Sequence, residues 1–254
     1  MISNLFLYFL IYSFLGWVWE GIVSLKERHK IVNRGFLNGP YCPIYGVGAL
    51  AFIYLDQYIG NNLILMFLIG GLVACVIEYI TSWAMELIFH ARWWDYSNKR
   101  FNINGRVYLR GFLAFGLGAL VVHFGHQYIT SFVDSFSHKD TIAIILAIIF
   151  TLDVISTNKS FARFTRILKD FQETISQGAI IQYITKGKNQ LFAELGKRTS
   201  RILTYPQKRL INAFPNYKSS YDNAYKEIQK LYKDTKFKPE KTAHARKKTK
   251  KIVK

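Results

Sequence analysis

Cysteine, proline and acidic residues are all scarce in this chain of 254 residues, which has two Cys, five Pro and 16 Asp+Glu against 34 Lys+Arg. The two cysteines, Cys42 and Cys75, are too few for a disulfide framework or a cysteine-based zinc site, and we interpret both as small buried residues. The phosphate-binding pattern Gly-x-x-x-x-Gly-Lys-Ser/Thr is also missing, so the chain is not its own ATPase by that mechanism. We expect no metal ion and no cofactor.

Apolar and basic residues are abundant, but they occupy different parts of the chain. Hydrophobic residues make up 50% of the sequence, and the formal net charge is +18. Residues 1–157 contain 10 Lys+Arg and 9 Asp+Glu, whereas residues 158–254 contain 24 and 7. This division argues against a single soluble globule. It predicts a membrane domain over residues 1–157 and a basic tail over residues 158–254.

Long apolar runs in the first part predict an all-α integral membrane protein with about five transmembrane helices, since a helix needs about 20 mostly apolar residues to cross a bilayer. The expected spans cover residues 2–25, 43–59, 63–89, 107–129 and 141–155. The second and fifth are short. The alternative for residues 141–155 is a buried or interfacial helix.

The basic residues of the short loops predict the orientation, because Lys and Arg are retained on the cytoplasmic side. Four basic residues follow each of the first, third and fifth spans, while the other loops and the N-terminus carry only Lys139. We therefore expect a multi-pass protein of the cell membrane, with its N-terminus outside and its C-terminus in the cytoplasm. The regular alternation also favours a fifth span.

The tail is predicted to be helical and partly amphipathic. One apolar stripe at helical spacing runs through Phe161, Phe164, Leu168, Phe171 and Ile175. Residues such as Gly178 are expected to divide the tail into short helices, and about the last 15 residues to be disordered. A basic helix with aromatic residues suits the anionic lipids of the inner leaflet, and the alternative is a solvated tail that only fixes the topology. Nucleic-acid binding is disfavoured because no recognition fold accompanies the basic tract.

Ionisable residues inside or beside the apolar runs predict a polar site, because burying a carboxylate in lipid costs several kcal/mol. Within the third span, Glu78, Ser82 and Glu86 share one helical face. Most of the candidate residues converge on the cytoplasmic side. The full set is Glu20, Arg34, Glu78, Ser82, Glu86, Arg92, Asp95, Asn104 and Arg106. Two interpretations stay open: the charges hold the spans in register, or they bind a polar substrate or ion. No residue is assigned a catalytic role.

The loop between the first two spans is rich in glycine and proline. Its characteristic residues are Gly35, Gly39, Pro40, Pro43 and Gly46. This composition disfavours a regular helix across the first half of the segment. Irregular backbone at membrane depth is tolerated only where it is buried in protein or lines a wet cavity.

Several short motifs occur in order and carry a family resemblance. They are Leu15-Gly16-Trp17 with Glu20, the run Arg34 to Gly46, Glu78-Tyr79 with Ser82 and Glu86, Arg92-Trp93-Trp94-Asp95-Tyr96-Ser97, and Asn102-Ile103-Asn104-Gly105-Arg106. Over about residues 5–125 the chain resembles the CmpB-like bacterial membrane proteins described as putative ABC-transporter type IV. The resemblance implies a permease.

Three function classes follow. The first is a permease or transport-associated subunit that depends on a separate ATPase and, with so few spans, works as a homo-oligomer. The second is a non-transporting membrane protein that binds anionic lipid or a protein partner through the polar site and the tail. The third, an intramembrane enzyme acting through Glu20, Glu86, Arg92 and Asp95, is disfavoured because neither a nucleophile motif nor a metal cluster accompanies these residues. We therefore expect a protein that is not an enzyme.

Overall fold

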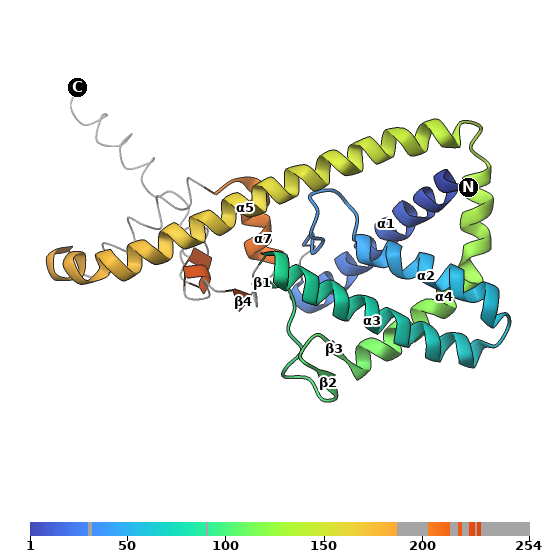
Figure 1. Cartoon of the computed structure of the whole chain (residues 1–254), viewed down its shortest axis with the longest axis horizontal. Coiled ribbons are helices and arrows are strands. Elements are labelled where there is room, and N and C mark those ends of the chain that lie inside the picture. The colour runs from blue at the N-terminus through green and yellow to red at the C-terminus, as the bar shows by residue number, and fades with distance from the viewer. Residues whose placement is uncertain are drawn as a thin grey trace, which may run out of the picture. The chain divides into compact units, whose positions relative to one another are not determined.

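The computed structural model describes residues 1–29, 32–89, 91–186, 203–213, 218–219, 224–226 and 228–229. The helices are α1 (Ile2–Arg28), α2 (Pro43–Ile59), α3 (Leu63–Phe89), α4 (Leu109–Asp134), α5 (Lys139–Lys186) and α7 (Tyr205–Ala213). The two-residue strands are β1 (Ala91–Arg92), β2 (Asn102–Ile103), β3 (Val107–Tyr108) and β4 (Lys218–Ser219), and the antiparallel pairs are β1 with β4 and β2 with β3. Helices α1 to α4 pack in one bundle (Figure 1).

Four helices of the described chain are long and apolar enough to cross a membrane. They cover Ile2–Lys26, Leu63–Phe89, Leu109–Asp134 and Lys139–Asp170. The fold is therefore that of a mostly helical membrane protein, as the sequence predicts. Helix α2 has the predicted bounds, but with 17 residues it is not one of these four.

The structure corrects the expected elements in two places. The helix predicted over residues 107–129 runs from Leu109 to Asp134. It begins two residues later than predicted because Val107 and Tyr108 pair with β2 instead of joining the helix, and it ends five residues later. The predicted fifth span is only the first part of α5, a helix of 48 residues that passes through Gly178 without a break. Helical periodicity continues past the apolar run, so the change in composition at residue 158 does not end the helix.

Two compact units make up the chain. Unit 1 contains Met1–Phe161 and Asn212–Ser220, and unit 2 contains Ala162–Ile211 and Tyr221–Lys254. The core of unit 1 combines aromatic side chains of α1 and α2 with small residues of the facing helices, such as Tyr8, Phe52 and Ala119. Small residues allow helix backbones to approach closely, which favours association in a membrane, where no hydrophobic driving force brings helices together.

The segment between α1 and α2 folds back along α1. The backbone N–H of Cys42 donates to the carbonyl oxygen of Ser13 at 2.9 Å. Because Ser13 precedes the end of α1 at Arg28 by 15 residues, the chain returns by about 22 Å along the helix before α2 begins. Helix α2 therefore starts beside the middle of α1. Its Gly46 lies so close to Phe9 and Ser13 that a Cβ atom would collide with them.

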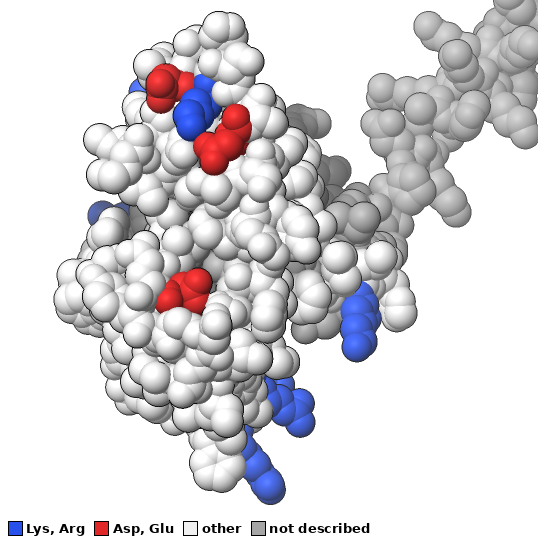
Figure 2. All heavy atoms as spheres, turned by 90° about the vertical axis from the view of Figure 1, so that its right-hand side faces the viewer, with Lys and Arg blue, Asp and Glu red and all other residues white. Residues whose placement is uncertain are grey.

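The end of the bundle that lies opposite the last turns of α1 and α3 carries few charges. Here α1 begins, α2 turns into α3, and α4 turns into α5, and Figure 2 shows a mostly uncharged surface with a few acidic and basic side chains. Lys139 at this end pairs with Asp134 at 3.0 Å.

The apolar stripe predicted for the tail is present on α5, but its first residues pack inside the protein. In unit 2, Phe164 and Leu168 are buried, and the ring of Phe164 contacts that of Tyr225 at a centroid distance of 6.3 Å. In unit 1, Phe161 is buried against Phe89 and Trp93. These side chains are not available to the lipid headgroups. The side chains of Phe171 and Ile175, and the last 15 residues, lie outside the described part of the chain.

Candidate functional site

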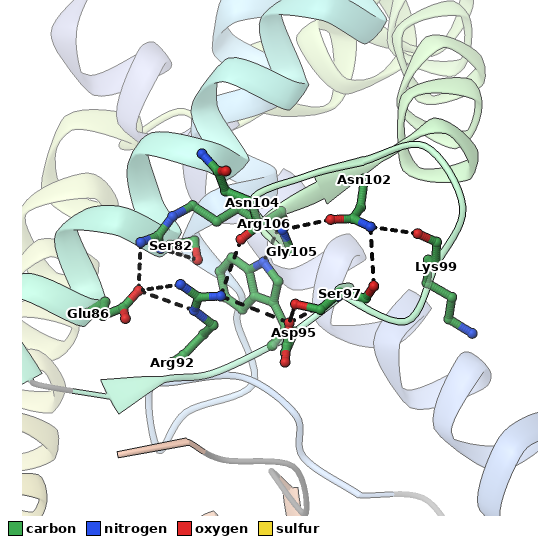
Figure 3. Close-up of polar contacts among 11 residues, drawn as sticks. Ser82, Glu86, Arg92, Asp95, Ser97, Lys99, Asn102, Asn104, Gly105 and Arg106 are labelled. Atoms are coloured by element: carbon green, nitrogen blue, oxygen red, sulfur yellow. Dashed lines mark hydrogen bonds and ion pairs between the residues drawn. The ribbon is translucent and has the colours of Figure 1, made fainter. Parts of the chain in front are cut away.

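An ion-pair network joins the end of α3 to the segment that follows it (Figure 3). The carboxylate oxygen Oε2 of Glu86 accepts hydrogen bonds from Nη2 of Arg106 at 2.6 Å and from Nη2 of Arg92 at 3.0 Å. Nη1 of Arg106 also donates to Oγ of Ser82, which lies one helical turn before Glu86 on α3, at 3.0 Å. The Arg106 side chain is 9% exposed and that of Arg92 is 21% exposed, so Arg106 is the buried centre of the network.

A hairpin made by β2 and β3 holds Arg106 in place. Gly105 has a positive φ of 66°, and its N–H donates to Oδ1 of Asn102 at 2.9 Å. The indole Nε1 of Trp94 donates to the carbonyl oxygen of Arg106 at 3.1 Å. The neighbouring Asn104 also has a positive φ, and its amide donates to the hydroxyl of Tyr79 on α3 at 2.9 Å. The turn thus fixes both the backbone and the register of Arg106 against α3.

Asp95 lies at the edge of this network. Its Oδ1 lies 3.9 Å from Nη1 of Arg92 and accepts a hydrogen bond from the backbone N–H of Ser97 at 3.0 Å. The Arg92 guanidinium also donates to the carbonyl oxygen of Asn104 at 3.2 Å. Asp95 and Asn104 therefore shape the turn around the two arginines.

A second group joins α1 to α2 and the loop before it. The Glu20 carboxylate accepts a hydrogen bond from the hydroxyl of Tyr45 at 2.7 Å and lies 3.5 Å from Nη1 of Arg34. The Tyr45 ring packs directly on Gly16, one turn before Glu20, where a Cβ would clash with it. Gly16 and Glu20, which belong to one sequence motif, thus contact the same tyrosine: Gly16 makes room for the Tyr45 ring, and Glu20 accepts the hydrogen bond of its hydroxyl.

A third group surrounds Glu78, which lies deepest in α3. Its side chain is buried, with the residue 7% exposed, and its Oε1 accepts a hydrogen bond from the hydroxyl of Tyr96 at 3.3 Å. Glu78 precedes the end of α3 at Phe89 by 11 residues, about 16 Å along the helix. The segment containing Tyr96 must therefore fold back along α3, as the first loop does along α1.

Tyr96 links the second and third groups electrostatically. Burial raises the pKa of its phenol above the usual value, and the nearby carboxylates of Glu78 and Glu20 raise the pKa further. The hydroxyl consequently stays protonated and remains a hydrogen-bond donor to Glu78. The ring of Tyr108 lies beside it, with a centroid distance of 4.4 Å.

The glycine and proline loop is held by a residue that the sequence analysis missed. Oδ2 of Asp153 on α5 accepts hydrogen bonds from the backbone N–H of Gly39 and from the hydroxyl of Tyr41, each at 2.8 Å. Thr157, one turn later, accepts a hydrogen bond from the Asn38 amide at 2.8 Å. The sequence contained one signal for Asp153: a carboxylate inside the predicted fifth span is as unusual as Glu78 in the third span.

The other residues of this loop have separate positions. The N–H of Gly35 donates to Oδ1 of Asn33, which also accepts from the indole of Trp17, both at 3.0 Å. Pro40 is exposed, and Pro43 begins α2. The loop is non-helical up to Cys42, as its composition predicts.

One further polar pair lies away from these groups. Nδ1 of His123 on α4 contacts Oδ1 of Asp56 on α2, near the end of α2. The described residues contain no group of three or more His, Cys, Asp or Glu side chains that could hold a metal ion.

The structure therefore brings the predicted residues to one end of the bundle as three contact groups. They are Ser82, Glu86, Arg92, Asp95, Asn104 and Arg106; Glu20 and Arg34; and Glu78. The sequence analysis did not foresee that Tyr45 and Tyr96 would be the partners of Glu20 and Glu78. Two backbone segments that fold back along the helices supply most of these contacts.

No curated protein and no solved structure matches the chain. The model of one protein family, described as putative ABC-transporter type IV, matches residues 7–158, a range that covers α1 from Leu7, α2 to α4, the first part of α5 and all three contact groups. The chain belongs to this family, the putative ABC-transporter type IV proteins.

Proposed function

We propose that this chain is a transport-associated membrane subunit with a solute pathway that opens at the end of the bundle containing Glu78 and Glu86. The observation that carries the proposal is the fold-back of the loop before α2. Hydrogen bonding of Cys42 to Ser13 starts α2 in the middle of the bundle, so irregular backbone occupies the rest of that crossing. Such backbone is tolerated where it is buried in protein or lines a cavity, and interrupted helices of this kind form binding sites in many transporters.

The proposed role is binding and conduction without catalysis. Glu20, Glu86 and Asp95 already accept hydrogen bonds or lie beside guanidinium groups, which leaves them poorly placed to act as a general base or nucleophile. Paired charges at the mouth of a pathway can instead exchange partners with a polar solute.

The proposed topology has five crossings, in which α2 together with the loop before it makes the second. With the N-terminus outside, the ion-pair network lies at the cytoplasmic face and the sparsely charged end in Figure 2 lies outside. We expect reporter fusions after Arg34 and after Arg100 to be cytoplasmic, and fusions at Gly60 and Ser137 to be external. A cytoplasmic reporter at Gly60 would contradict the second crossing.

A water-filled pathway predicts that thiols on the Glu78 face of α3 react with hydrophilic reagents. We expect Ser82→Cys, in a chain with Cys42 and Cys75 replaced by alanine, to be modified by a membrane-impermeant thiol reagent in proteoliposomes. Ser82 contacts Arg106, and a neighbouring guanidinium favours the reactive thiolate. The measurement is the modification rate by mass spectrometry.

Ile80→Cys is the matched control, because Ile80 lies at nearly the same depth on the exposed apolar face of α3. It should remain unmodified in lipid. Equal rates at Ser82→Cys and Ile80→Cys, or no reaction at either, would refute the pathway. If the pathway exists, Glu78→Gln and Glu86→Gln should insert normally and lose solute uptake.

The proposed partners are a separate ATPase subunit, which family membership suggests, and at least one further copy of the chain, because five crossings are few for a transporter. Purification of the full chain in mild detergent tests these partners. Co-purification of an ATPase in stoichiometric amount is the expected result, and its absence at every detergent concentration that preserves the fold would contradict an ATPase-dependent role.

A second candidate, binding of anionic lipid by the tail, is favoured by one observation. Lys159, Arg163, Arg166 and Lys169 on α5 are all exposed. Since the first residues of the apolar stripe are buried, this binding would rest on charge, at roughly 1 kcal/mol per basic residue. Phosphate analysis of the purified protein separates the candidates: retained anionic phospholipid that is lost in an Arg163→Gln/Arg166→Gln/Lys169→Gln variant would favour lipid binding.

A further inference from the structure

Among the described residues at the polar end of the bundle, Glu78 is a buried carboxylate without a cationic partner; Asp153 also lacks one, but its two oxygens accept hydrogen bonds from Gly39, Tyr41 and Thr157. Arg34 lies beside Glu20, while Arg92 and Arg106 together face Glu86 and Asp95. These contacts match each of the three arginines with one of three carboxylates. Within the part of the chain that the structure describes, no basic nitrogen lies within 4.0 Å of the Glu78 carboxylate. One negative charge is thus left at Glu78.

Glu78 is also incompletely hydrogen-bonded. The residue is only 7% exposed, and its Oε2 atom is buried without a hydrogen-bond partner among the described residues. Its other oxygen accepts one hydrogen bond, from Tyr96. A buried carboxylate with an unsatisfied oxygen is costly unless a proton or another positive charge neutralises it.

The surroundings of Glu78 suit a small monovalent cation. The hydroxyl of Tyr96 adds a phenolic oxygen beside the Glu78 carboxylate. The ring of Tyr108 lies tilted beside that of Tyr96, at a centroid distance of 4.4 Å, and adds an aromatic surface, which attracts cations. A divalent ion would exceed the single unbalanced charge. These groups come from α3 and the segment before α4, so one ligand would tie the two together.

We propose that the Glu78 carboxylate, with the hydroxyl of Tyr96, binds one monovalent cation, either an alkali ion or the ammonium group of a small solute. The inference deepens the proposed function, on which it rests for the access of the cation from the cytoplasmic side. It gives the solute, or an ion bound with it, a positive charge.

The test is the thermal unfolding midpoint of the purified full-length protein in mild detergent. NaCl, KCl and methylammonium chloride are titrated separately, with N-methylglucamine chloride keeping the ionic strength constant. We expect one of the three to raise the midpoint in a saturable manner, by about 5–10 °C at a hundredfold excess over the dissociation constant. Saturation by Na⁺ or K⁺ identifies an ion site, and saturation by methylammonium alone identifies an ammonium site.

Glu78→Gln should abolish this shift, because the neutral amide keeps the shape and removes the charge. Glu173→Gln, the same change at a side chain that is 57% exposed, should retain it. If Glu78→Gln does not fold, Tyr96→Phe carries the test: it keeps the ring and removes the hydroxyl beside Glu78, and we expect it to weaken binding about tenfold.

A midpoint that none of the three cations changes would overturn the proposal, and so would an equal shift in wild type and Glu78→Gln. Either result would mean that Glu78 is neutralised by a proton alone. The outcome is independent of the Ser82→Cys experiment. If a cation shifts the midpoint but Ser82→Cys does not react, the cation site is supported and the pathway is refuted. If Ser82→Cys reacts but no cation shifts the midpoint, the pathway is supported and the cation site is refuted.

Discussion

Arg106→Met is expected to lower the free energy of unfolding by about 2–4 kcal/mol, the cost of removing one partner from a buried, charged hydrogen-bond network. The Arg106 side chain is 9% exposed and donates to both Glu86 and Ser82. Methionine fills much of the same volume but leaves both acceptors without this donor. Unfolding in mixed micelles with increasing sodium dodecyl sulfate, followed by circular dichroism, measures the change.

The matched control is Arg100→Met, since Arg100 is exposed on the loop just before β2. It should change the stability by less than about 0.5 kcal/mol. Arg92→Met should fall between the two, because Arg92 shares Glu86 but is more exposed. A double-mutant cycle of Arg106→Met with Glu86→Gln should give a coupling energy above about 0.5 kcal/mol. Additive effects would contradict a direct interaction between these side chains in the folded protein.

The same change also separates the two interpretations of the ion pairs that the sequence left open. If the network only holds α3 and the hairpin in register, the loss of function in Arg106→Met should follow the loss of folded protein. If the network also forms the mouth of the pathway, Arg106→Met should change the modification rate of Ser82→Cys at temperatures where the protein is fully folded.

The helix bounds were predicted best where an apolar run begins or ends beside a proline or a glycine. Helices α2 and α3 have the predicted bounds because Pro43 suits a first helical turn and Gly60 separates two apolar runs. The end of α5 could not be predicted in this way, since the chain becomes basic after Asn158 while its helical periodicity continues. Strands of only two residues, such as β2 and β3, carry no periodic signal at all.

The charged side chains of the site were predictable, but their partners were not. Glu78 and Glu86 were identified because an ionisable residue in an apolar run is unusual. The roles of Tyr45 and Tyr96 depend on two segments that fold back along α1 and α3, and such a path is set by tertiary contacts between distant residues, as between Cys42 and Ser13. The spacing of residues along the chain gives no information on these contacts.

Asp153→Ala is expected to release the loop before α2 and to destabilise the protein by about 2–4 kcal/mol, because hydrogen bonds to a charged group contribute about 1.5–3 kcal/mol each and are not additive. The carboxylate accepts hydrogen bonds from Gly39 and Tyr41 at 2.8 Å. The Tyr41 hydroxyl is the donor in this contact, because the carboxylate can only accept. Without Asp153 the Gly39 N–H and the Tyr41 hydroxyl lose this acceptor on α5.

Cys42 reports on this release directly. It is 6% exposed at the end of the loop, so its modification by a thiol reagent should be slow in wild type and at least about tenfold faster in Asp153→Ala, if local opening becomes easier by about 1.4 kcal/mol. Cys75 is half-buried inside α3; its rate should stay unchanged in Asp153→Ala, and it serves as the internal control. Asp134→Ala, which removes an exposed carboxylate at the other end of the bundle, should leave both rates unchanged.

Equal acceleration at Cys42 and Cys75 would mean that Asp153 stabilises the whole bundle and does not position the loop. A selective increase in the modification rate of Cys42 would show that the loop before α2 opens separately from the helices, as a gate on a solute pathway has to do.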